Sequence, residues 1–314
     1  MDTDWGMIAI RLGLYLSLML LVGLAAFPLY ALREGERRDG VMLATKKTLV
    51  FWSGASILLS LLGFLALVAQ MMGSSIADID WQTSRSIIIE TPIGAAWVVR
   101  MVALIACLLA AILIKRSDET RLATVLGTSA VALATLVWTG HAGATEGMVG
   151  GIHKASDMLH MIAAAIWLGG IAAFLAMLRI PDDGLWGDRL TVSHRALDSF
   201  ARNGTICVAV IIVTGLINSQ ILVGISNITV LVDSLYGWLL ILKLLLVGMM
   251  MLLGAQNRWR LTPGLGQALA DGDTAKAVSA LRASLLIEAA AGVVVLSAVA
   301  WLGTLEPTAS AAMS

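Results

Sequence analysis

Long apolar segments, separated by short polar stretches, recur along the whole chain. A helix of about twenty apolar residues crosses the roughly 30 Å hydrocarbon core of a bilayer, and only helices or closed barrels satisfy their backbone there. The pattern predicts an all-α polytopic membrane protein with eight transmembrane helices, forming a single integral membrane domain over residues 1–314. The expected spans are residues 7–32, 48–72, 93–115, 122–141, 154–178, 202–224, 235–256 and 283–304.

The composition agrees with a membrane environment. Of 314 residues, 59% are hydrophobic and 13% are charged, whereas charged residues make up about a quarter of a soluble domain. The net charge is zero and there is no basic tail, so the lipid bilayer is the expected partner and nucleic acid is not. Cys107 and Cys207 both fall inside predicted spans and do not form a disulfide framework.

The distribution of lysine and arginine predicts the orientation. Four alternate loops contain five, three, four and four of the 21 basic residues, namely 33–47, 115–121, 179–202 and 256–282. The loops on the opposite side contain only Arg85 and Lys154. Cytoplasmic loops carry the excess of basic residues in membrane proteins. We therefore expect both termini, and the loop between the fourth and fifth spans, to face outward.

Two segments of the chain resemble each other. TPIGAAWVVR at 91–100 and SLYGWLLILK at 234–243 each contain a hydroxyl residue, a glycine three positions later and a cation six positions beyond it. GLAAF in the first span also matches GIAAF in the fifth. Either the chain consists of two parallel four-helix repeats, residues 1–145 and 146–314, or these short matches are coincidental.

The loop between the fourth and fifth spans, together with the start of the fifth span, contains three of the four histidines. His153, Asp157 and His160 follow the spacing i, i+4, i+7, which places them on one face of a helix. His141 comes from the end of the preceding span, across a glycine-rich turn. Two interpretations remain open, a metal site and a hydrogen-bonded polar cluster. Imidazole binds copper, zinc, nickel and iron alike, so the histidines alone do not choose the metal.

Soft ligands favour copper, because thioethers bind Cu(I) well. The chain contains 15 methionines, and Met148 lies in the histidine loop beside Glu146. Cys107 and Cys207 either relay a soft cation toward the cytoplasm or are small buried residues. The residues therefore predict a copper ion, Cu+ or Cu2+, with the following candidate ligands: His141, His153 and His160, assisted by Met148, Glu146 or Asp157.

Two basic residues lie inside predicted spans. Arg100 and Lys243 are each about 10 Å below the outer surface by helix rise, and a charge at that depth needs a partner. Glu288 in the last span is the expected partner of Lys243, and Asp157 or Glu90 that of Arg100. Either these are ion pairs that lock helices together, or the cations tune the site or bind an anionic group.

Several motifs, in their order along eight spans, resemble the CopD family of bacterial copper resistance and copper uptake proteins. They are DMLHMIAAAIWLGGIAAF, TPIGAAWVVR, SLYGWLLILKLLL and RASLLIEAAAG. The resemblance implies copper handling at the bacterial inner membrane, from periplasm to cytoplasm, with a separate copper-binding CopC-like protein as partner and both termini in the periplasm. It also implies outer-facing histidine and methionine ligands, and His141, His153 and His160 stand at matching places.

Two other functions remain as alternatives. The chain is a membrane b-type cytochrome if haem binds the same histidines, with Arg100 and Lys243 suited to propionates or a quinone. It is a scaffold if it holds copper at the outer surface without moving it. No pairing of a nucleophile with a base is visible in the sequence, so we do not expect an enzyme.

Overall fold

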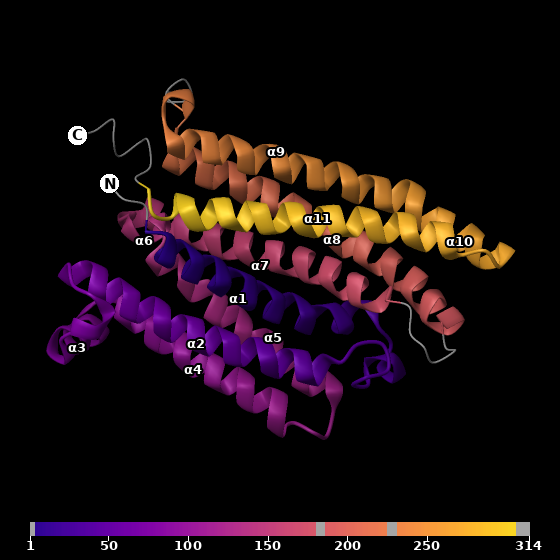
Figure 1. Ribbon diagram of the computed structural model, residues 1–314, viewed down its shortest axis with the longest axis horizontal. Helices are drawn as coiled ribbons and strands as arrows, with labels where there is room; N and C mark the ends of the chain where they lie inside the picture. The colour runs from indigo at the N-terminus through magenta and orange to yellow at the C-terminus, as the bar shows by residue number, and fades with distance from the viewer. Residues whose placement is uncertain (1–3, 180–185, 225–230, 306–314) are drawn as a thin grey trace.

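The structure is a computed structural model that describes residues 4–179, 186–224 and 231–305. Within these ranges it is helical, with no strand. Eight helices are long and apolar enough to cross a membrane, and they run side by side along the long axis of the molecule (Figure 1). The protein is therefore an all-α, multi-pass membrane protein, as the hydropathy pattern predicts, and a lipid bilayer surrounds it.

The eight long helices keep the order of the expected spans. They are α1 (Trp5–Ala31), α2 (Thr45–Met72), α4 (Pro92–Leu113), α5 (Asp118–Ala134), α7 (Gly147–Met177), α8 (Trp186–Leu222), α9 (Leu235–Gln256) and α11 (Ala275–Leu302). Short elements join them: η1 (Glu34–Arg37), η2 (Ile76–Asp78), α3 (Trp81–Glu90), η3 (Thr135–Thr139), α6 (His141–Ala144), η5 (Asn257–Leu261, a π-helical turn) and α10 (Thr262–Asp271).

Helix α8 begins about four turns before the expected start of its span. Its first turns are polar, so hydropathy does not detect them, but they pack against the loop that follows α1. There Arg195 forms an ion pair with Glu36 of η1. This contact is between distant parts of the chain, and it explains why the helix extends beyond its apolar stretch.

Helices α1 and α7 pack against each other at the centre of the molecule. Gly23 of α1 and Gly169 of α7 are in contact backbone to backbone, because a Cβ placed on Gly23 would lie 2.2 Å from the carbonyl oxygen of Ala165. Small residues allow this close approach of two helices in a membrane. Helices α2 and α5 pack beside α1, with α4 against both of them, and α8 and α11 pack beside α7, with α9 against α11 (Figure 1).

The two similar segments begin helices in the same way. The side chain of Thr91 accepts a hydrogen bond from the Gly94 N–H at 3.0 Å, and that of Ser234 accepts one from the Gly237 N–H at 3.1 Å. A Cβ on either glycine would lie 2.1 or 1.8 Å from a carbonyl oxygen of the preceding segment. Thr91 and Ser234 are thus both N-cap residues, and each is followed by a glycine that must pack closely against the preceding segment. The duplication into residues 1–145 and 146–314 stays a prediction.

Candidate functional site

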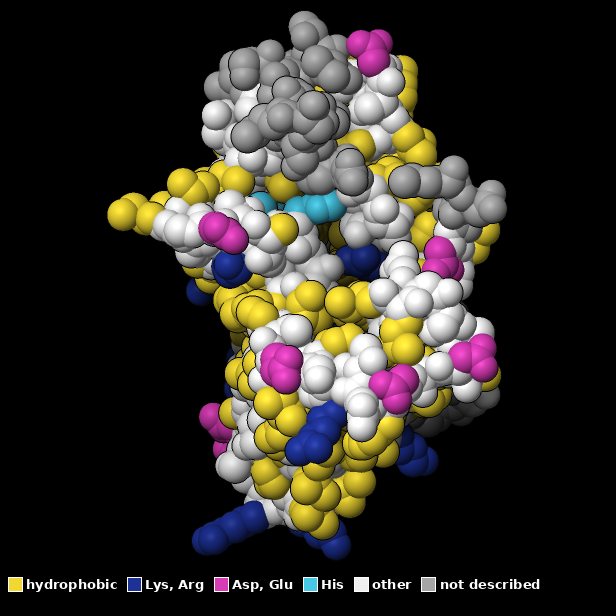
Figure 2. Space-filling model, turned by 90° about the vertical axis from the view of Figure 1, so that its left-hand side faces the viewer, with side chains coloured by type: hydrophobic (Ala, Val, Ile, Leu, Met, Phe, Trp, Pro, Cys, Tyr) yellow, Lys and Arg dark blue, Asp and Glu magenta, His cyan; other side chains and the backbone are white. Residues whose placement is uncertain are grey.

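A cavity of about 920 Å³ lies among α1, α7, α8, α9 and α11. Its walls are mostly leucine, valine, isoleucine and methionine, and its polar side chains gather toward the end of the bundle that carries Trp5 and Trp301. Figure 2 looks at that end and shows histidine side chains in a hollow, with a basic side chain nearby. The polar lining consists of Arg11, Tyr15, His141, His153, Asp157, His160, Asn218, Ser219, Gln220, Tyr236 and Lys243.

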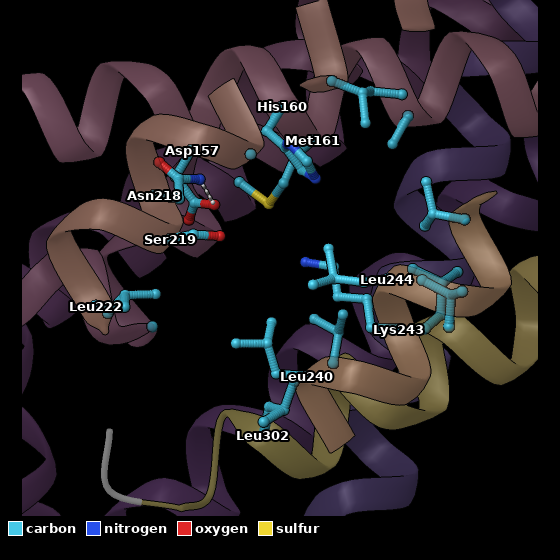
Figure 3. Close-up of a pocket in the computed structure, with 18 of the residues that line it drawn as sticks. Asp157, His160, Met161, Asn218, Ser219, Leu222, Leu240, Lys243, Leu244 and Leu302 are labelled. Atoms are coloured by element: carbon cyan, nitrogen blue, oxygen red, sulfur yellow. Dashed lines mark hydrogen bonds between the residues drawn. The ribbon is translucent and has the colours of Figure 1, made fainter. Parts of the chain in front are cut away.

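Helix α7 supplies one polar wall of this cavity. His153, Asp157 and His160 all line it, so the expectation that their spacing places them on one helical face is confirmed. Asp157 accepts a hydrogen bond from the side-chain amide of Asn218 in α8, at 3.3 Å. Figure 3 shows Asp157, Asn218 and His160 around the same space, with Lys243 projecting into it from α9.

The hydrogen bonds of His160 determine which of its ring nitrogens is free. Its Nδ1 lies 2.9 Å from the hydroxyl oxygen of Thr214 in α8. That hydroxyl donates its own hydrogen to the carbonyl oxygen of Val210 at 2.6 Å, so its oxygen accepts from the N–H at Nδ1. The Nε2 atom of His160 then carries the lone pair, which is the arrangement that a metal-binding imidazole requires.

His153 follows the same rule with a different threonine. Its Nδ1 lies 2.9 Å from the hydroxyl oxygen of Thr145, which donates to the carbonyl oxygen of His141 at 3.4 Å. This leaves Nε2 of His153 with the free lone pair. Thr145 therefore joins the loop that carries His141 to the start of α7, and it holds the His153 ring in place.

His141 has the opposite tautomer. Its Nε2 lies 3.1 Å from the carbonyl oxygen of Leu302, and since a carbonyl only accepts, Nε2 carries the hydrogen and Nδ1 the lone pair. Burial lowers the pKa of His141 below its usual 6.5, and the nearby charge of Arg11 lowers it further, while the hydrogen bond to Leu302 acts in the opposite direction. His141 is therefore neutral at pH 7.

The three rings line one cavity but do not surround one point. Among the residues that the structure describes, no three or more His, Cys, Asp or Glu side chains are grouped so that they could hold one metal ion. His153 and His160 are separated by about 10 Å along α7. The predicted set of metal ligands therefore stays a prediction. In the structure its histidines lie at successive depths along the cavity.

Two of the candidate ligands lie outside the cavity. Glu146 is the N-cap residue of α7 and is exposed, and the side chain of Met148 is 85% exposed. The methionine that does line the cavity from α7 is Met161. The sequence analysis favoured Met148 over it, although the i+4 spacing of Met161 from Asp157 places it on the same helical face. The sequence analysis did miss Asn218, because no local pattern indicates which helix packs against α7.

The expected partner of Lys243 is wrong. Glu288 instead accepts a hydrogen bond from the side-chain amide of Asn257, at the opposite end of α9, and its side chain is 1% exposed. Lys243 and Asn257 are about 21 Å apart along the helix, so Glu288 is level with Asn257 and far from Lys243. The opposite charge that acts on Lys243 is Asp157, across the cavity.

The expected partners of Arg100 are wrong too. Its Nε donates to the Thr135 hydroxyl at 2.8 Å, and its Nη2 to the Thr135 carbonyl at 3.3 Å. The residue is 4% exposed and does not line the cavity. It therefore binds the end of α5, where the helix gives way to η3, and reaches neither Asp157 nor Glu90.

The two cysteines lie in separate apolar cores. Cys107 is buried among α1, α4 and α5, with its sulfur 3.5 Å from the Ser53 hydroxyl. Cys207 is buried in the core around α7, α8 and α11. Neither lines the cavity. This placement agrees with small buried residues, and the alternative of a relay for a soft cation stays a prediction.

Comparison with known proteins places the chain in a family. Residues 1–152 match the model described as copper resistance protein D-like, N-terminal domain, and residues 194–302 match copper resistance protein D. His153, Asp157 and His160 lie between the two matched regions. No solved structure matches the chain.

Three relatives are informative. The chain is 37% identical over 313 residues to copper resistance protein D of Pseudomonas syringae pv. tomato, covering 98% of each chain. It is 28% identical to inner membrane protein YebZ of Escherichia coli strain K12, over 96% of this chain and 98% of that one. It is 33% identical over 122 residues to copper transport protein CutJ of Bacillus subtilis strain 168, covering 38% of this chain and 20% of that protein. The chain belongs to the copper resistance protein D family.

Proposed function

We propose that this protein binds copper at the periplasmic face of a bacterial inner membrane and moves it toward the cytoplasm. The observation that carries the proposal is that His141, His153 and His160 each keep an unprotonated ring nitrogen on the wall of one cavity. Neutral imidazoles with a fixed tautomer are the usual histidine ligands of copper. The names of two relatives refer to copper, which agrees with this choice of metal.

The proposed orientation follows from the positions of the basic loops. The loops rich in lysine and arginine lie at the end of the bundle opposite the histidines (Figure 1). If that end is cytoplasmic, as the excess of basic residues favours, the cavity opens to the periplasm. Both ends of the described chain, near Trp5 and Trp301, are then periplasmic as well.

The depth of the ligands favours stepwise binding. His141 and His153 stand near the rim, linked through Thr145. His160 and the thioether of Met161 come deeper along α7. Because no single point has three ligands, we propose that copper passes from the first pair to the second. Asp157 offsets the positive charge of Lys243, which otherwise repels an arriving cation.

A separate periplasmic donor, similar to CopC, delivers the copper in this proposal. Met148 and Glu146 support it, because both are exposed at the start of α7 outside the cavity. A soft thioether and a carboxylate in that position are suited to a transient transfer between two proteins. The polar groups of the cavity are suited to binding a copper ion and passing it on, and we propose no catalysed reaction.

The test measures copper binding and copper movement separately. Cu(I) affinity of purified protein is measured by competition with a chromogenic chelator, and accumulation is measured in cells and in proteoliposomes. Replacing His153 and His160 together by alanine should abolish both, whereas His194→Ala, a histidine outside the cavity, serves as the matched control. Unchanged uptake in the double variant contradicts the proposal. Binding without uptake in proteoliposomes indicates a scaffold that holds copper without moving it.

Haem on the same histidines is a second candidate, which would make the protein an electron-transfer cytochrome. The observation that favours it is the free Nε2 of His160 in a large cavity, with the ammonium of Lys243 on the opposite wall to pair with an acidic substituent. An absorption spectrum of the purified protein separates the two candidates. A Soret band that disappears in His160→Ala supports haem, and its absence supports copper alone.

A further inference from the structure

The cavity opens sideways between two helices as well as toward one end. In the first four spans α2 packs on α4. These are the second and third spans of the first four. The second and third spans of the last four, α8 and α9, do not pack on each other in the same way: α8 packs mainly on α7, and α9 packs mainly on α11. At the far end α8 meets η5, the turn that follows α9, where Arg258 donates to the Thr205 hydroxyl at 2.6 Å.

The edges of this gap face the outside of the bundle. Leu216 of α8 and Leu244 of α9 both line the cavity, and yet they are 67% and 57% exposed. On a membrane-spanning helix, exposed leucines face lipid chains. The gap between α8 and α9 is therefore an apolar side opening through which a lipophilic molecule can enter from the bilayer.

The inner end of this opening is polar. Lys243 projects into it as a hydrogen-bond donor. The side-chain oxygen of Asn218 is buried without a hydrogen-bond partner, while its amide nitrogen donates to Asp157. The Nε2 atom of His160 is a free acceptor, as its bond to Thr214 requires. The buried Asn218 oxygen does not face the cavity, so the site offers one strong donor, Lys243, and one acceptor, His160, to a ligand that carries both kinds of group.

Charge and depth decide the class of ligand. Lys243 and Asp157 are opposite charges across the cavity, so a neutral head group is favoured and a phosphate is repelled by the carboxylate. Lys243 lies about 13 Å along α9 from its N-cap, Ser234. That depth is within the hydrocarbon, whereas lipid phosphates remain in the head-group region.

We propose that this cavity binds a membrane-soluble quinone or quinol. The quinol ring lies between Lys243, which donates to one hydroxyl oxygen, and Nε2 of His160, which accepts from the other hydroxyl; a quinone keeps only the first of these bonds, through a ring carbonyl. The apolar tail leaves through the gap between α8 and α9. The proposal concerns binding only and does not depend on copper, although His160 belongs to both sites.

The test uses decylubiquinone and decylubiquinol as probes, with metal-free purified protein and titration calorimetry. Gly248 lines the cavity, and a Cβ placed there meets open space, so Gly248→Leu fills the site without touching its polar groups. Gly254 lies on the same helix, is equally open and does not line the cavity, which makes Gly254→Leu the matched control. Lys243→Met removes the ammonium and keeps an apolar stem.

The original protein and Gly254→Leu should bind the probe with equal affinity. Gly248→Leu and Lys243→Met should weaken binding roughly ten-fold or more, since each removes either the space or a charged hydrogen bond. Equal affinity in Gly248→Leu and Gly254→Leu, or no saturable binding by the original protein, overturns the proposal. Native mass spectrometry adds a further outcome: a phospholipid that Gly248→Leu displaces, without quinone binding, assigns the cavity to phospholipid instead.

Two controls separate this result from folding and from copper. Leucine is a better helix former than glycine, so both glycine variants should fold, which monodisperse elution and helical circular dichroism verify. Cu(I) affinity is measured on the same variants. Gly248→Leu leaves every histidine in place and should bind copper normally, so loss of quinone binding is distinguishable from failure of the copper site.

Discussion

His160 of α7 and Thr214 of α8 are joined by a hydrogen bond of 2.9 Å, from the ring Nδ1 to the threonine hydroxyl. The main chain of Thr214 makes a second hydrogen bond to α7: the Ser156 hydroxyl donates to the Thr214 carbonyl oxygen at 3.2 Å. One residue of α8 thus determines both the tautomer of a candidate copper ligand and the position of α7 beside it.

This relationship predicts that Thr214→Val weakens copper binding while leaving the protein folded. Valine has nearly the same shape as threonine but lacks the hydroxyl that orients the ring. Loss of such an outer partner lowers metal affinity by about ten- to a hundred-fold. Competition with a Cu(I) chelator measures the change, and Thr214→Ser, which keeps a hydroxyl, should retain most of the affinity. Equal losses in both variants indicate a packing effect and contradict the argument.

The contact between α1 and α7 predicts that Gly23→Ala destabilises the protein. The added methyl group meets the Ala165 carbonyl oxygen at 2.2 Å, and this oxygen belongs to the backbone of a central helix, so no side chain can move away to relieve the clash. Overpacking of this kind costs about 1–3 kcal/mol. The control is Gly54→Ala in α2, where a Cβ meets open space. Thermal unfolding in detergent should show a clear decrease for Gly23→Ala and none for the control.

The lowered pKa of His141 predicts that stability falls as the pH falls. The unfolded chain binds a proton near pH 6.5, whereas burial keeps the folded His141 neutral to lower pH. Below pH 6.5 the unfolded state therefore binds more protons, so stability is fully present above that pH and is lost as the pH falls toward the lowered folded value.

Thermal unfolding between pH 7.5 and about pH 5 measures this effect. His141→Gln places an amide donor near the position of Nε2 for the Leu302 carbonyl and removes the titrating ring, so its unfolding temperature should depend less on pH in this interval. An identical pH dependence in the variant would show that other groups cause the loss.

The pairing of Glu288 with Asn257 makes a different prediction from the one that joined Glu288 to Lys243. Glu288→Ala leaves the buried amide of Asn257 without its acceptor and should destabilise the protein by about 1–3 kcal/mol. Glu288→Gln keeps an oxygen acceptor and should be close to neutral in a thermal unfolding assay. Quinone binding at Lys243 should be unchanged in Glu288→Gln. A large loss of quinone binding in Glu288→Gln would contradict this and would indicate that Glu288 interacts with Lys243 after all.

The ends of helices show where local patterns suffice and where they fail. The apolar runs predict the order and number of spans, because crossing a bilayer depends on the length and hydropathy of each segment alone. Helix α8 starts far before its apolar stretch, since the Arg195–Glu36 contact that accompanies its polar turns is made with the α1–α2 loop. Such a contact has no signature within the segment itself.

The surroundings of the histidines likewise include one part that the sequence predicts and one part that it does not. The spacing of His153, Asp157 and His160 is enough to place them on one side of α7, because the helical period is a local property. Which residues lie opposite them depends on how far each neighbouring helix is shifted along its axis. Lys243 therefore faces Asp157, although Glu288 was the expected partner.

By itself the sequence determined that this is a polytopic helical membrane protein of the copper resistance protein D family, with three of its four histidines gathered near one end of the bundle. Only the tertiary structure decided that Asn218 joins those histidines, that Arg100 and the cysteines do not, and that α8 and α9 separate to open the cavity. The physical reason is that hydropathy and helical period act within one segment, whereas side-chain partners and gaps depend on packing between segments far apart in the chain.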